Sequence, residues 1–436
     1  WAAMAPGFWL WFAAVALIFY VTQSRPRPEG WLWQWGRVQG AMTLGLAPLT
    51  LVLFQQVSLV SPVANAIAIP VVSFVVTPLA LIGAVLPWDL PLTLAHGTLS
   101  LLMKAMVPLA ALGGAVWHQH APVAWTLLPA LAGVLWLLAP CGVPGRVLGL
   151  VLMLPLFSVR PPSPAPGEAR MDVLDVGQGT AVVVRTANHA LLYDAGPAWG
   201  SEGDSGNVSG NDSGARVVVP FLRGEGVDAL DLLVISHDDN DHAGGGASVI
   251  RAYPGAWLVS SLASDHPLQA LARGTASCAA GYAWQWDGVR FTVLHPDRRE
   301  SGNPYTVLND RSCVLRVEAG RTAALLAGDI GRRGEEALLA RGEPVRAEVL
   351  LVPHHGSATS SSPAFVDAVA PRQAVFSVGY RNRFGHPRED VVARYRQKGS
   401  LLLRTDRLGA LRVVLRDESA VTSAYRQEAR RYWRTE

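Results

Sequence analysis

The sequence predicts a multi-domain protein in which a bundle of transmembrane α-helices precedes a soluble domain built around β-strands. Residues 1–160 hold only 8 of the 37 basic and 34 acidic side chains, and the other 276 residues hold the rest. Long apolar runs are confined to this first part, which also contains 10 of the 15 Trp. Short β-branched runs between Gly-rich turns follow in the second part. Together these observations exclude a disordered chain, a fibrous protein and a single soluble domain.

Six apolar runs are expected to form the helical bundle. The first five have roughly the 20 residues that a transmembrane helix needs, and the sixth is shorter and contains Pro155. The positive-inside rule places Arg25, Arg27, Arg37 and Arg146 on the cytoplasmic side. If all six runs span the membrane, the soluble domain is periplasmic or extracellular; an interfacial sixth run or a re-entrant segment at 61–70 would reverse this orientation. The runs are 4–21, 38–60, 64–87, 93–116, 121–139 and 146–159.

Polar and Pro residues interrupt the third run, and a cation lies within the fourth. Pro62, Asn65 and Pro70 follow one another closely, and Lys104 stands in the middle of an apolar stretch. Such residues are costly in hydrocarbon unless they face protein or water. Two interpretations remain open: ordinary helix kinks with a snorkelling Lys, or a pore or groove.

A Pro-rich linker at 161–168 is expected to separate a membrane portion, 1–160, from a soluble domain, 169–436. A flexible insertion is expected at 200–214. Because the chain opens on Trp1 inside an apolar run, we expect it to be a fragment that lacks an N-terminal part. Strands are predicted at 171–176, 181–187, 190–193 and 230–235, and a helix at 216–225.

The strongest chemical signal is the segment His237 to His242, read as His-x-Asp-x-Asp-His, directly after a predicted strand. It offers two imidazoles and two alternating carboxylates, which a loop can wrap around metal ions. A solvated acidic turn is the alternative, but further ligands follow at the ends of later apolar strands. Asp329 follows 323–328, and His354 and His355 follow 348–353. The pattern therefore predicts a centre for one or two metal ions.

With these motifs the sequence resembles the metallo-β-lactamase superfamily, and more narrowly the ComEC family of DNA-uptake channels. The superfamily resemblance implies a four-layered αββα sandwich with metals at one edge of the two sheets, and the ComEC resemblance extends over essentially the whole chain. The segments that carry it are 175–179, 194–196, 309–315, 353–357 and 382–387 in the soluble part, and 7–10, 13–18, 61–65 and 69–70 in the membrane part.

The resemblance implies two divalent metal ions. Carried over by position, His237 and Asp239 hold the first ion, Asp241 and His242 hold the second, and Asp329 bridges them. The last imidazole is expected to be His355, because in this fold the residue directly before the Gly usually faces the metal. Most superfamily members have His where this chain has Asp239, and the added oxygen shifts the preference from Zn²⁺ toward Mn²⁺ without deciding it.

Further roles also follow from the resemblance. Asp241 is expected to orient the attacking water while it binds metal. His386 either contacts a phosphoryl oxygen or protonates the leaving oxygen, or it only stabilises its turn. The residues expected on the substrate side are His354, Asn309, Asn382 and Ser357.

A basic flank and two cysteines complete the candidate features. Residues 372–436 contain 15 basic and 7 acidic side chains, and aromatic residues accompany the last arginines. This flank either binds nucleic acid by charge and stacking or is a solvated terminal helix; its members are Arg426, Arg430, Arg431 and Arg434 with Tyr425, Tyr432 and Trp433. Cys278 and Cys313 could pair if the domain is periplasmic.

The resemblance implies an inner-membrane DNA-uptake channel for natural transformation, with a metal-dependent nuclease that degrades the strand that is not transported. It also implies DNA as partner, together with a DNA receptor and a cytoplasmic ATP-driven motor. A membrane-tethered metallo-phosphodiesterase acting on an envelope or small-molecule substrate is the alternative. A transport protein with an inactive metal site is a third possibility, and the near-complete ligand set disfavours it.

Overall fold

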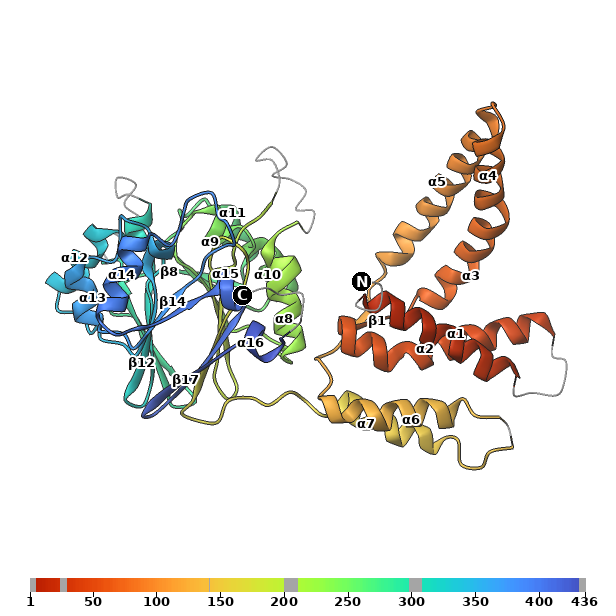
Figure 1. The fold of residues 1–436 in the computed structure, drawn as a ribbon, viewed down its shortest axis with the longest axis horizontal. Helices are drawn as coiled ribbons and strands as arrows, with labels where there is room; N and C mark the ends of the chain where they lie inside the picture. The colour runs from red at the N-terminus through yellow and green to blue at the C-terminus, as the bar shows by residue number, and fades with distance from the viewer. Residues whose placement is uncertain (1–4, 24–29, 141, 200–210, 298–307, 431–436) are drawn as a thin grey trace. The chain divides into compact units, whose positions relative to one another are not determined.

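The computed structural model describes residues 5–23, 30–140, 142–199, 211–297 and 308–430. The chain divides into two compact units (Figure 1). The first comprises Trp1–Pro161 together with Arg223–Gly226, and the second comprises Pro162–Leu222 and Val227–Glu436.

Helices dominate the described part of the first unit, and one short antiparallel ribbon accompanies them. The ribbon pairs β1 (Gln56–Ser58) with β2 (Val116–His118). The helices are α1 (Pro6–Gln23), α2 (Trp31–Phe54), α3 (Ser61–Val71), α4 (Thr77–Val85), α5 (Leu90–Ala110), α6 (Leu127–Leu137) and α7 (Leu148–Ser158).

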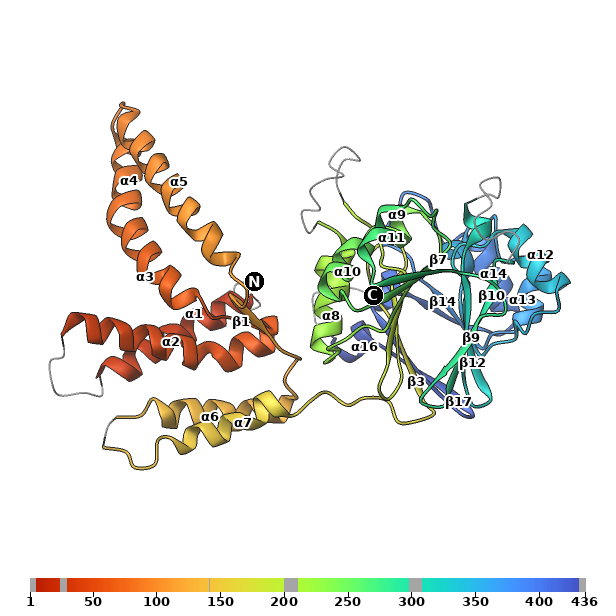
Figure 2. The same ribbon diagram turned by 180° about the vertical axis from the view of Figure 1, so that it is seen from behind.

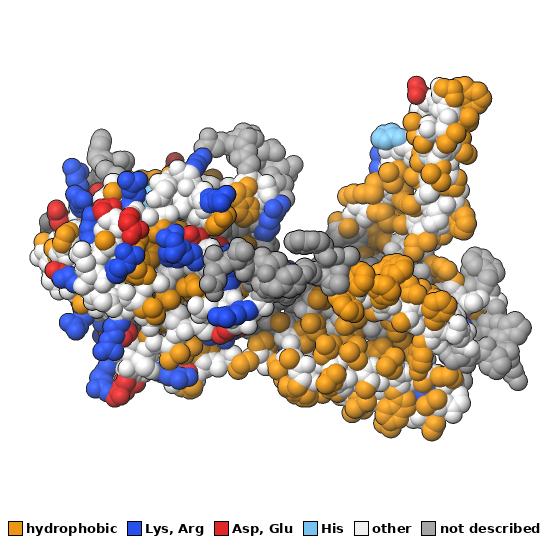
Figure 3. All heavy atoms as spheres, in the orientation of Figure 1, with side chains coloured by type: hydrophobic (Ala, Val, Ile, Leu, Met, Phe, Trp, Pro, Cys, Tyr) orange, Lys and Arg blue, Asp and Glu red, His pale blue; other side chains and the backbone are white. Residues whose placement is uncertain are grey.

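Three stretches of helix in the described residues are long and apolar enough to cross a membrane: Trp33–Phe54, Ser61–Val85 and Leu90–Ala110. The helices α1, α6 and α7 are shorter, and the 11 residues of α7 extend only about 17 Å, against a hydrocarbon core of about 30 Å. Figure 3 shows apolar side chains covering most of the visible surface of the helices. An apolar outer surface on helices suits contact with lipid.

In two of the predicted apolar runs, the helix ends before the apolar sequence does. The run 38–60 leaves its helix at Phe54, because Gln55 takes a left-handed conformation with φ of 58°. The run 93–116 likewise stops being helical at Ala110. The residues beyond these ends form the β1–β2 ribbon, which gives partners to backbone groups that a broken helix leaves unpaired.

The segment 61–70, expected as an interruption, is helical. Pro62 lies in the first turn of α3, where its missing N–H costs nothing. Pro70 removes a hydrogen bond near the end of α3, and a π-helical turn over Val72–Val76 follows directly before α4. The helical structure is therefore interrupted between Phe54 and Ser61 rather than within 61–70.

The helices α6 and α7 pack through glycine. A Cβ atom on Gly133 would lie 2.4 Å from the carbonyl oxygen of Gly149, and one on Gly149 would lie 2.3 Å from that of Gly133. Small residues at such a crossing let two apolar helices approach closely without a hydrophobic driving force. Leu51 of α2, Ala130 of α6 and Leu156 of α7 form a fully buried cluster beside it.

The second unit is a four-layered αββα sandwich, as the sequence predicts (Figure 2). One sheet has the strand order β17-β16-β3-β4-β5-β6-β7-β8 and the other has the order β15-β14-β13-β12-β11-β10-β9. The first sheet consists of β3 (Ala169–Val173), β4 (Val182–Arg185), β5 (Ala190–Tyr193), β6 (Leu232–Ile235), β7 (Trp257–Ser260), β8 (Gly274–Ser277), β16 (Leu411–Arg416) and β17 (Ser419–Ala424). The second consists of β9 (Ala283–Trp286), β10 (Val289–His295), β11 (Val314–Ala319), β12 (Thr322–Leu326), β13 (Val349–Leu351), β14 (Gln373–Phe376) and β15 (Leu401–Arg404).

Helices cover the outer face of each sheet. The first sheet packs against α8 (Val219–Gly224), α10 (Gly246–Ala252) and α11 (Pro267–Leu271), and the second against α12 (Arg332–Ala340), α13 (Pro363–Val369) and α14 (Glu389–Gln397). A third apolar core fills the space between the sheets and includes Val234, Phe291 and Leu326. Short helices join other elements: α9 (Asn240–Ala243), α15 (Thr405–Leu408) and α16 (Tyr425–Glu428).

The predicted strands form, 190–193 with the predicted bounds as β5 and the other three with shifted or shorter bounds. The predicted 171–176 and 181–187 correspond to β3 and β4, and 230–235 corresponds to β6. The predicted helix 216–225 begins as a π-helical turn at Gly214–Val218 and continues as α8. Most of the predicted insertion, residues 200–210, lies outside the described residues.

Parallel pairing decides where the functional residues meet. In the first sheet β5, β6 and β7 are parallel, and in the second β12, β13 and β14 are parallel. Residues that directly follow these strands therefore lie along one edge of each sheet. The His and Asp residues singled out from the sequence follow β6, β12 and β13.

Candidate metal centre

The first group of ligands comes from the loop after β6. His237 lies two residues beyond the strand, and the short helix α9 carries Asp241 and His242. The rings of His237 and His242 are buried, with centroids 4.3 Å apart. Asp239, just before α9, is more exposed, and its Oδ2 lies 3.2 Å from Nε2 of His237.

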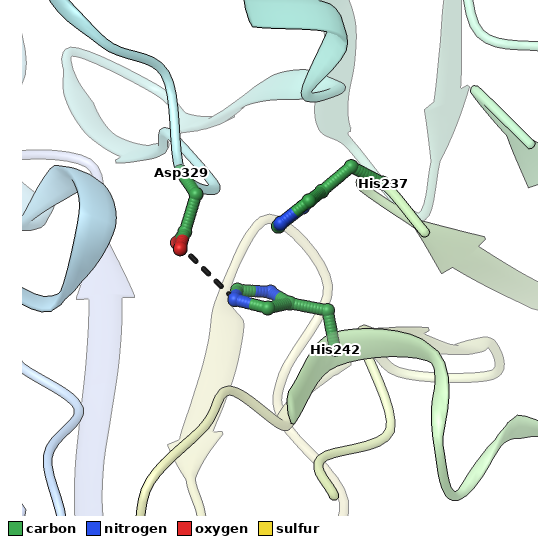
Figure 4. Close-up of side chains that lie close together, drawn as sticks. All are labelled: His237, His242 and Asp329. Carbon is green, nitrogen blue, oxygen red and sulfur yellow. Dashed lines mark ion pairs between the residues drawn. The ribbon is translucent and has the colours of Figure 1, made fainter. Parts of the chain in front are cut away.

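The second group comes from the ends of β12 and β13. Asp329 follows β12, and its Oδ1 lies 3.2 Å from Nε2 of His242 (Figure 4). Its other oxygen, Oδ2, lies 3.5 Å from Nε2 of His355. His354 and His355 both take left-handed backbone conformations, with φ of 49° and 54°, in the sharp turn after β13. Such conformations cost energy in non-Gly residues and recur where a side chain must be aimed.

Two overlapping clusters result, and each has ligand atoms within 4.8 Å of one another. His237, His242 and Asp329 form one cluster, and Asp241, His242 and His355 form the other. Nε2 of His355 lies 3.2 Å from Oδ2 of Asp241. Imidazole nitrogens and carboxylate oxygens at such separations suit a Zn²⁺ or Mn²⁺ ion.

Two buried acceptors fix the rings of His242 and His355. The Nδ1–H of His242 donates to Oδ2 of Asp194 at 2.7 Å, and the Nδ1–H of His355 donates to the carbonyl oxygen of Ser377 at 2.8 Å. With Nδ1 protonated, each ring turns its Nε2 lone pair toward the cluster. Partners of this kind behind a ligand raise its basicity and hold its orientation.

The geometry of these two rings tests whether a cation fits. The two Nε2 atoms face each other at 3.2 Å. Two lone pairs at that distance repel each other, so a positive charge, either a proton or a metal ion, is required between them. The donor set therefore fits the divalent ion that the sequence predicts.

The carboxylates favour positive charge in the same place. Burial opposes protonation of His242, yet the charges of Asp329 and Asp194 outweigh it and raise the pKa of His242 well above its ordinary value. Burial likewise opposes ionisation of Asp241, but the hydrogen bond with His355 and the charge of His242 lower the pKa of Asp241 to about 2. The cluster attracts cations at neutral pH.

Two histidines lie beside the clusters rather than in them. Nε2 of His354 is 3.8 Å from Oδ2 of Asp329 and 3.4 Å from Nδ2 of Asn309. The ring of His386 stacks on that of His354 with a centroid distance of 5.8 Å. Burial, and then the charges of His355 and His354, lower the pKa of His386 to about 4. His354, His386 and Asn309 thus form a rim next to the ligands.

Two of the residues expected to contact substrate use their polar groups within their own turns. The amide of Asn382 donates to the carbonyl oxygens of Gly379 and His386 and accepts from the His386 N–H. The hydroxyl of Ser357 lies 3.0 Å from that of Thr359 and is largely buried. Their geometry is that of residues that hold the rim in shape.

Sequence reasoning missed two residues that contact the candidate metal-binding histidines from behind. Asp194 is fully buried and accepts from Ser236 as well as from His242. The hydroxyl of Ser312 lies 3.4 Å from Nδ1 of His237 and accepts from the backbone N–H of Asp329. Asp194 directly follows the predicted strand 190–193, a signal that could have placed it at the same sheet edge as His237.

Two arginines of residues 372–436 pair with carboxylates at the start of the sandwich. Arg426 pairs with Asp175 at 2.9 Å and also donates to the carbonyl oxygen of Asp406. Arg412 pairs with Asp172. The positive charges of these two side chains are therefore already compensated. Arg431, Tyr432, Trp433 and Arg434 lie outside the described residues.

A disulfide joins Cys278 and Cys313, whose Cα atoms are 5.9 Å apart. Cys278 follows β8 of the first sheet, and Cys313 precedes β11 of the second. The bond therefore links the two sheets directly beside Ser312 and the metal cluster. The pairing considered from the sequence is present in the structure.

Two family models match the chain. The model described as "Competence protein" matches residues 1–143, and the model of the metallo-beta-lactamase superfamily matches residues 174–380. The chain is 38% identical to "Competence protein ComA" of Neisseria gonorrhoeae, over 94% of this chain and 56% of that protein. The chain is therefore similar to competence proteins over most of its own length.

Two further relatives extend the likeness over nearly the whole chain. "Recombination protein 2" of Haemophilus influenzae is 28% identical, over 93% of this chain and 53% of that protein. "Uncharacterized protein YcaI" of Escherichia coli is 32% identical, over 99% of this chain and 56% of that protein. The chain spans about half the length of these curated relatives.

These matches confirm the resemblance seen in the sequence. The apolar helices and the family together indicate a membrane protein. The metallo-beta-lactamase domain indicates a hydrolase fold that binds divalent metal.

Proposed function

We propose that this chain forms part of a DNA-uptake channel of the bacterial inner membrane and that its second unit is a metal-dependent nuclease. In this proposal the helices pass one DNA strand inward during natural transformation, and the sandwich domain hydrolyses the other strand. A DNA receptor and a cytoplasmic ATP-driven motor are the partners that such transport requires.

The observation that carries the proposal is the pair of ligand clusters that share His242. The residues that would hold two divalent ions, Mn²⁺ or Zn²⁺, are His237, Asp239, Asp241, His242, Asp329 and His355. When bound, two such ions supply hydroxide at neutral pH and neutralise a phosphodiester.

Side chains of the protein orient the attacking water, position the ligands and contact the phosphate. Asp241 orients the attacking water through its carboxylate, and Asp194 and Ser377 keep His242 and His355 in place. His386 and His354 contact the phosphate from the rim. The disulfide beside the centre supports a domain on the periplasmic side, because structural disulfides persist in oxidising compartments.

A cavity in the membrane unit with several polar side chains in its lining supports the transport half of the proposal. A cavity of about 280 Å³ lies between α2, β1 and α3. Its lining includes Gln39, Thr43, Ser61 and Asn65, which are polar groups in an apolar helical unit. Side chains of this kind inside a membrane mark a path for polar substrate.

The nuclease is tested with the whole chain purified in detergent. Cleavage of end-labelled single-stranded and duplex DNA is followed with Mn²⁺, with Zn²⁺ and with EDTA. We expect metal-dependent cleavage that Asp241→Asn and Asp329→Asn abolish and that Asp238→Asn retains. Metal binding without any cleavage of DNA would overturn the nuclease, and a screen of small phosphodiesters would then test the tethered phosphodiesterase.

The transport role is tested in a naturally competent host. Single exchanges are made in the host's own competence protein at the positions that match this chain, and the transformation frequency is measured. We expect Asn65→Leu to lower transformation strongly and Ile67→Leu, on the same helix, to leave it unchanged. Equal transformation by the two strains would contradict a path along this cavity.

A further inference from the structure

A loop at the rim of the metal centre carries, besides His386, aromatic and basic residues that the proposed cleavage chemistry does not use. Residues 380–386, here the 380–386 loop, connect β14 to α14. The loop starts at Gly379, where a Cβ atom would lie 2.6 Å from the backbone nitrogen of Gln178. Gly379 also donates its N–H to the Gln178 side chain. The amide of Asn382 closes the loop from within, so the loop has a fixed shape.

The fixed loop turns two aromatic rings and two arginines toward solvent. Tyr380 is 70% exposed and Phe384 is 51% exposed. The guanidinium of Arg381 lies over the ring of Tyr380 at 5.2 Å, and that of Arg383 lies over Phe384 at 4.9 Å. Arg381 holds a left-handed conformation with φ of 51°, a strained choice for a residue that packs against nothing in the core. Neither ring contributes to an apolar core of the domain.

A continuous path of rings leads from this loop to the metal ligands. Phe384 meets His386 edge to face with centroids 5.9 Å apart, and His386 stacks on His354. His354 in turn lies 3.8 Å from Asp329. A polymer that lies across Phe384 therefore passes directly into the cluster.

We propose that the 380–386 loop binds unpaired nucleotides and so makes the centre specific for single-stranded DNA; this inference rests on the proposed nuclease. Tyr380 and Phe384 stack on bases, and Arg381 and Arg383 contact the phosphates on either side. Aromatic rings alternating with arginines are the usual means of holding a single strand. Bases in a duplex are already stacked and paired, so exposed rings at a rim have no face of a base to contact.

The test measures DNA binding and cleavage separately, with the whole chain in detergent. Binding of a fluorescent single-stranded oligonucleotide, and of the same sequence as a duplex, is measured by anisotropy in EDTA. We expect the unchanged chain to favour the single strand. We expect the double exchange Tyr380→Ala with Phe384→Ala to weaken single-strand binding by about fivefold to hundredfold for each ring lost.

Matched variants separate stacking from general loss of surface. Tyr282→Ala removes an equally exposed ring elsewhere on the domain, and Arg290→Gln removes an exposed charge from β10. Both are expected to bind single strands normally. Tyr380→Phe with Phe384→Tyr keeps two rings and is expected to retain binding, whereas Arg381→Gln with Arg383→Gln is expected to weaken binding and flatten its salt dependence.

Each outcome decides between the two proposals. Single-strand binding that the ring variants lose supports the loop even where no metal produces cleavage, and in that case only the nuclease fails. Equal affinity for single strand and duplex, or normal single-strand binding by the double Ala variant, overturns the role of the loop. Metal-dependent cleavage in such a protein would leave the nuclease standing.

Discussion

His242 and His355 face each other through their Nε2 atoms at 3.2 Å, although 113 residues separate them in the chain. His242 belongs to the loop after β6 in the first sheet, and His355 follows β13 in the second. The centre is therefore assembled where the carboxyl ends of strands from both sheets meet.

The neighbouring histidines His354 and His355 are expected to differ sharply on exchange to Ala. His355→Ala removes a cluster member and is expected to lower metal affinity by at least about tenfold. His354→Ala removes a rim ring and is expected to keep metal affinity while raising the DNA concentration needed for half-maximal cleavage. Calorimetric titration with Mn²⁺ and steady-state cleavage measure the two effects. Reversal of the two results would show that His354 is the ligand.

Asp194→Asn tests the carboxylate behind His242. The exchange keeps the shape of the side chain but weakens its hold on the Nδ1–H of His242. We expect metal affinity to fall by about tenfold to hundredfold, because partners behind a metal ligand contribute that much. Saturating metal is expected to restore most of the activity, which a merely misfolded variant would not show. Asp238→Asn, in the same loop as His242 but paired with His266, serves as the control.

Asp287→Asn tests a group of hydrogen bonds that connects the two sheets. Asp287 occupies the turn between β9 and β10, and its carboxylate accepts hydrogen bonds from Thr186, Asn188 and His189 in the turn between β4 and β5. We expect a loss of about 1–2 kcal/mol at pH 7, since hydrogen bonds to a charged group are worth about that much. Thermal unfolding of both proteins measures this loss.

The effect of Asp287 is also expected to depend on pH. Burial opposes its ionisation, but the hydrogen bonds from Thr186 and Asn188 outweigh burial and hold the pKa of Asp287 well below its ordinary value. A lowered pKa stabilises the folded state above the ordinary value of about 4, and this stabilisation is lost as the pH falls further. The difference between Asp287→Asn and the unchanged protein should therefore shrink below about pH 4. A difference that stays constant from pH 7 to pH 3 would contradict this role.

Cys278→Ser tests the disulfide across the sheets. The bond closes a loop between residues 35 positions apart, for which a loss of about 2–4 kcal/mol is expected. We expect a lower unfolding midpoint in Cys278→Ser and in Cys313→Ser alike, and no further loss in the double variant. Thiol labelling of the unreduced, unfolded protein should modify only Cys141. Labelling of all three thiols would contradict the bond.

Much of the fold could be predicted from local patterns. The apolar runs predict the membrane helices because a backbone in lipid must satisfy its own hydrogen bonds, and a helix does so within one segment. The short β-branched runs predict strands, and the residues after Ile235, Leu326 and Leu351 could be placed at one edge because parallel strands end together. The ligand group could therefore be expected before any contact was known.

The parts that escaped prediction depend on pairings distant in sequence. The β1–β2 ribbon forms between segments about 60 residues apart, and nothing within Gln56–Ser58 indicates a partner. The role of Asp194 depends on the register of β5 against β6, which places it beside Ser236. The substrate contact expected of Asn382 came from the resemblance alone and stays a prediction, and the hydrogen bonds of its amide within its own turn could not be predicted from the sequence.

The division of ligands between the sheets makes the ion part of the folding equilibrium. His237 and His242 extend from one sheet, and Asp329 and His355 extend from the other. An unfolded chain has no such pocket, so bound metal favours the folded form by mass action. Above the dissociation constant, each tenfold rise in free metal adds about 1.4 kcal/mol to the free energy of unfolding. Without the metal the sandwich would therefore unfold more readily.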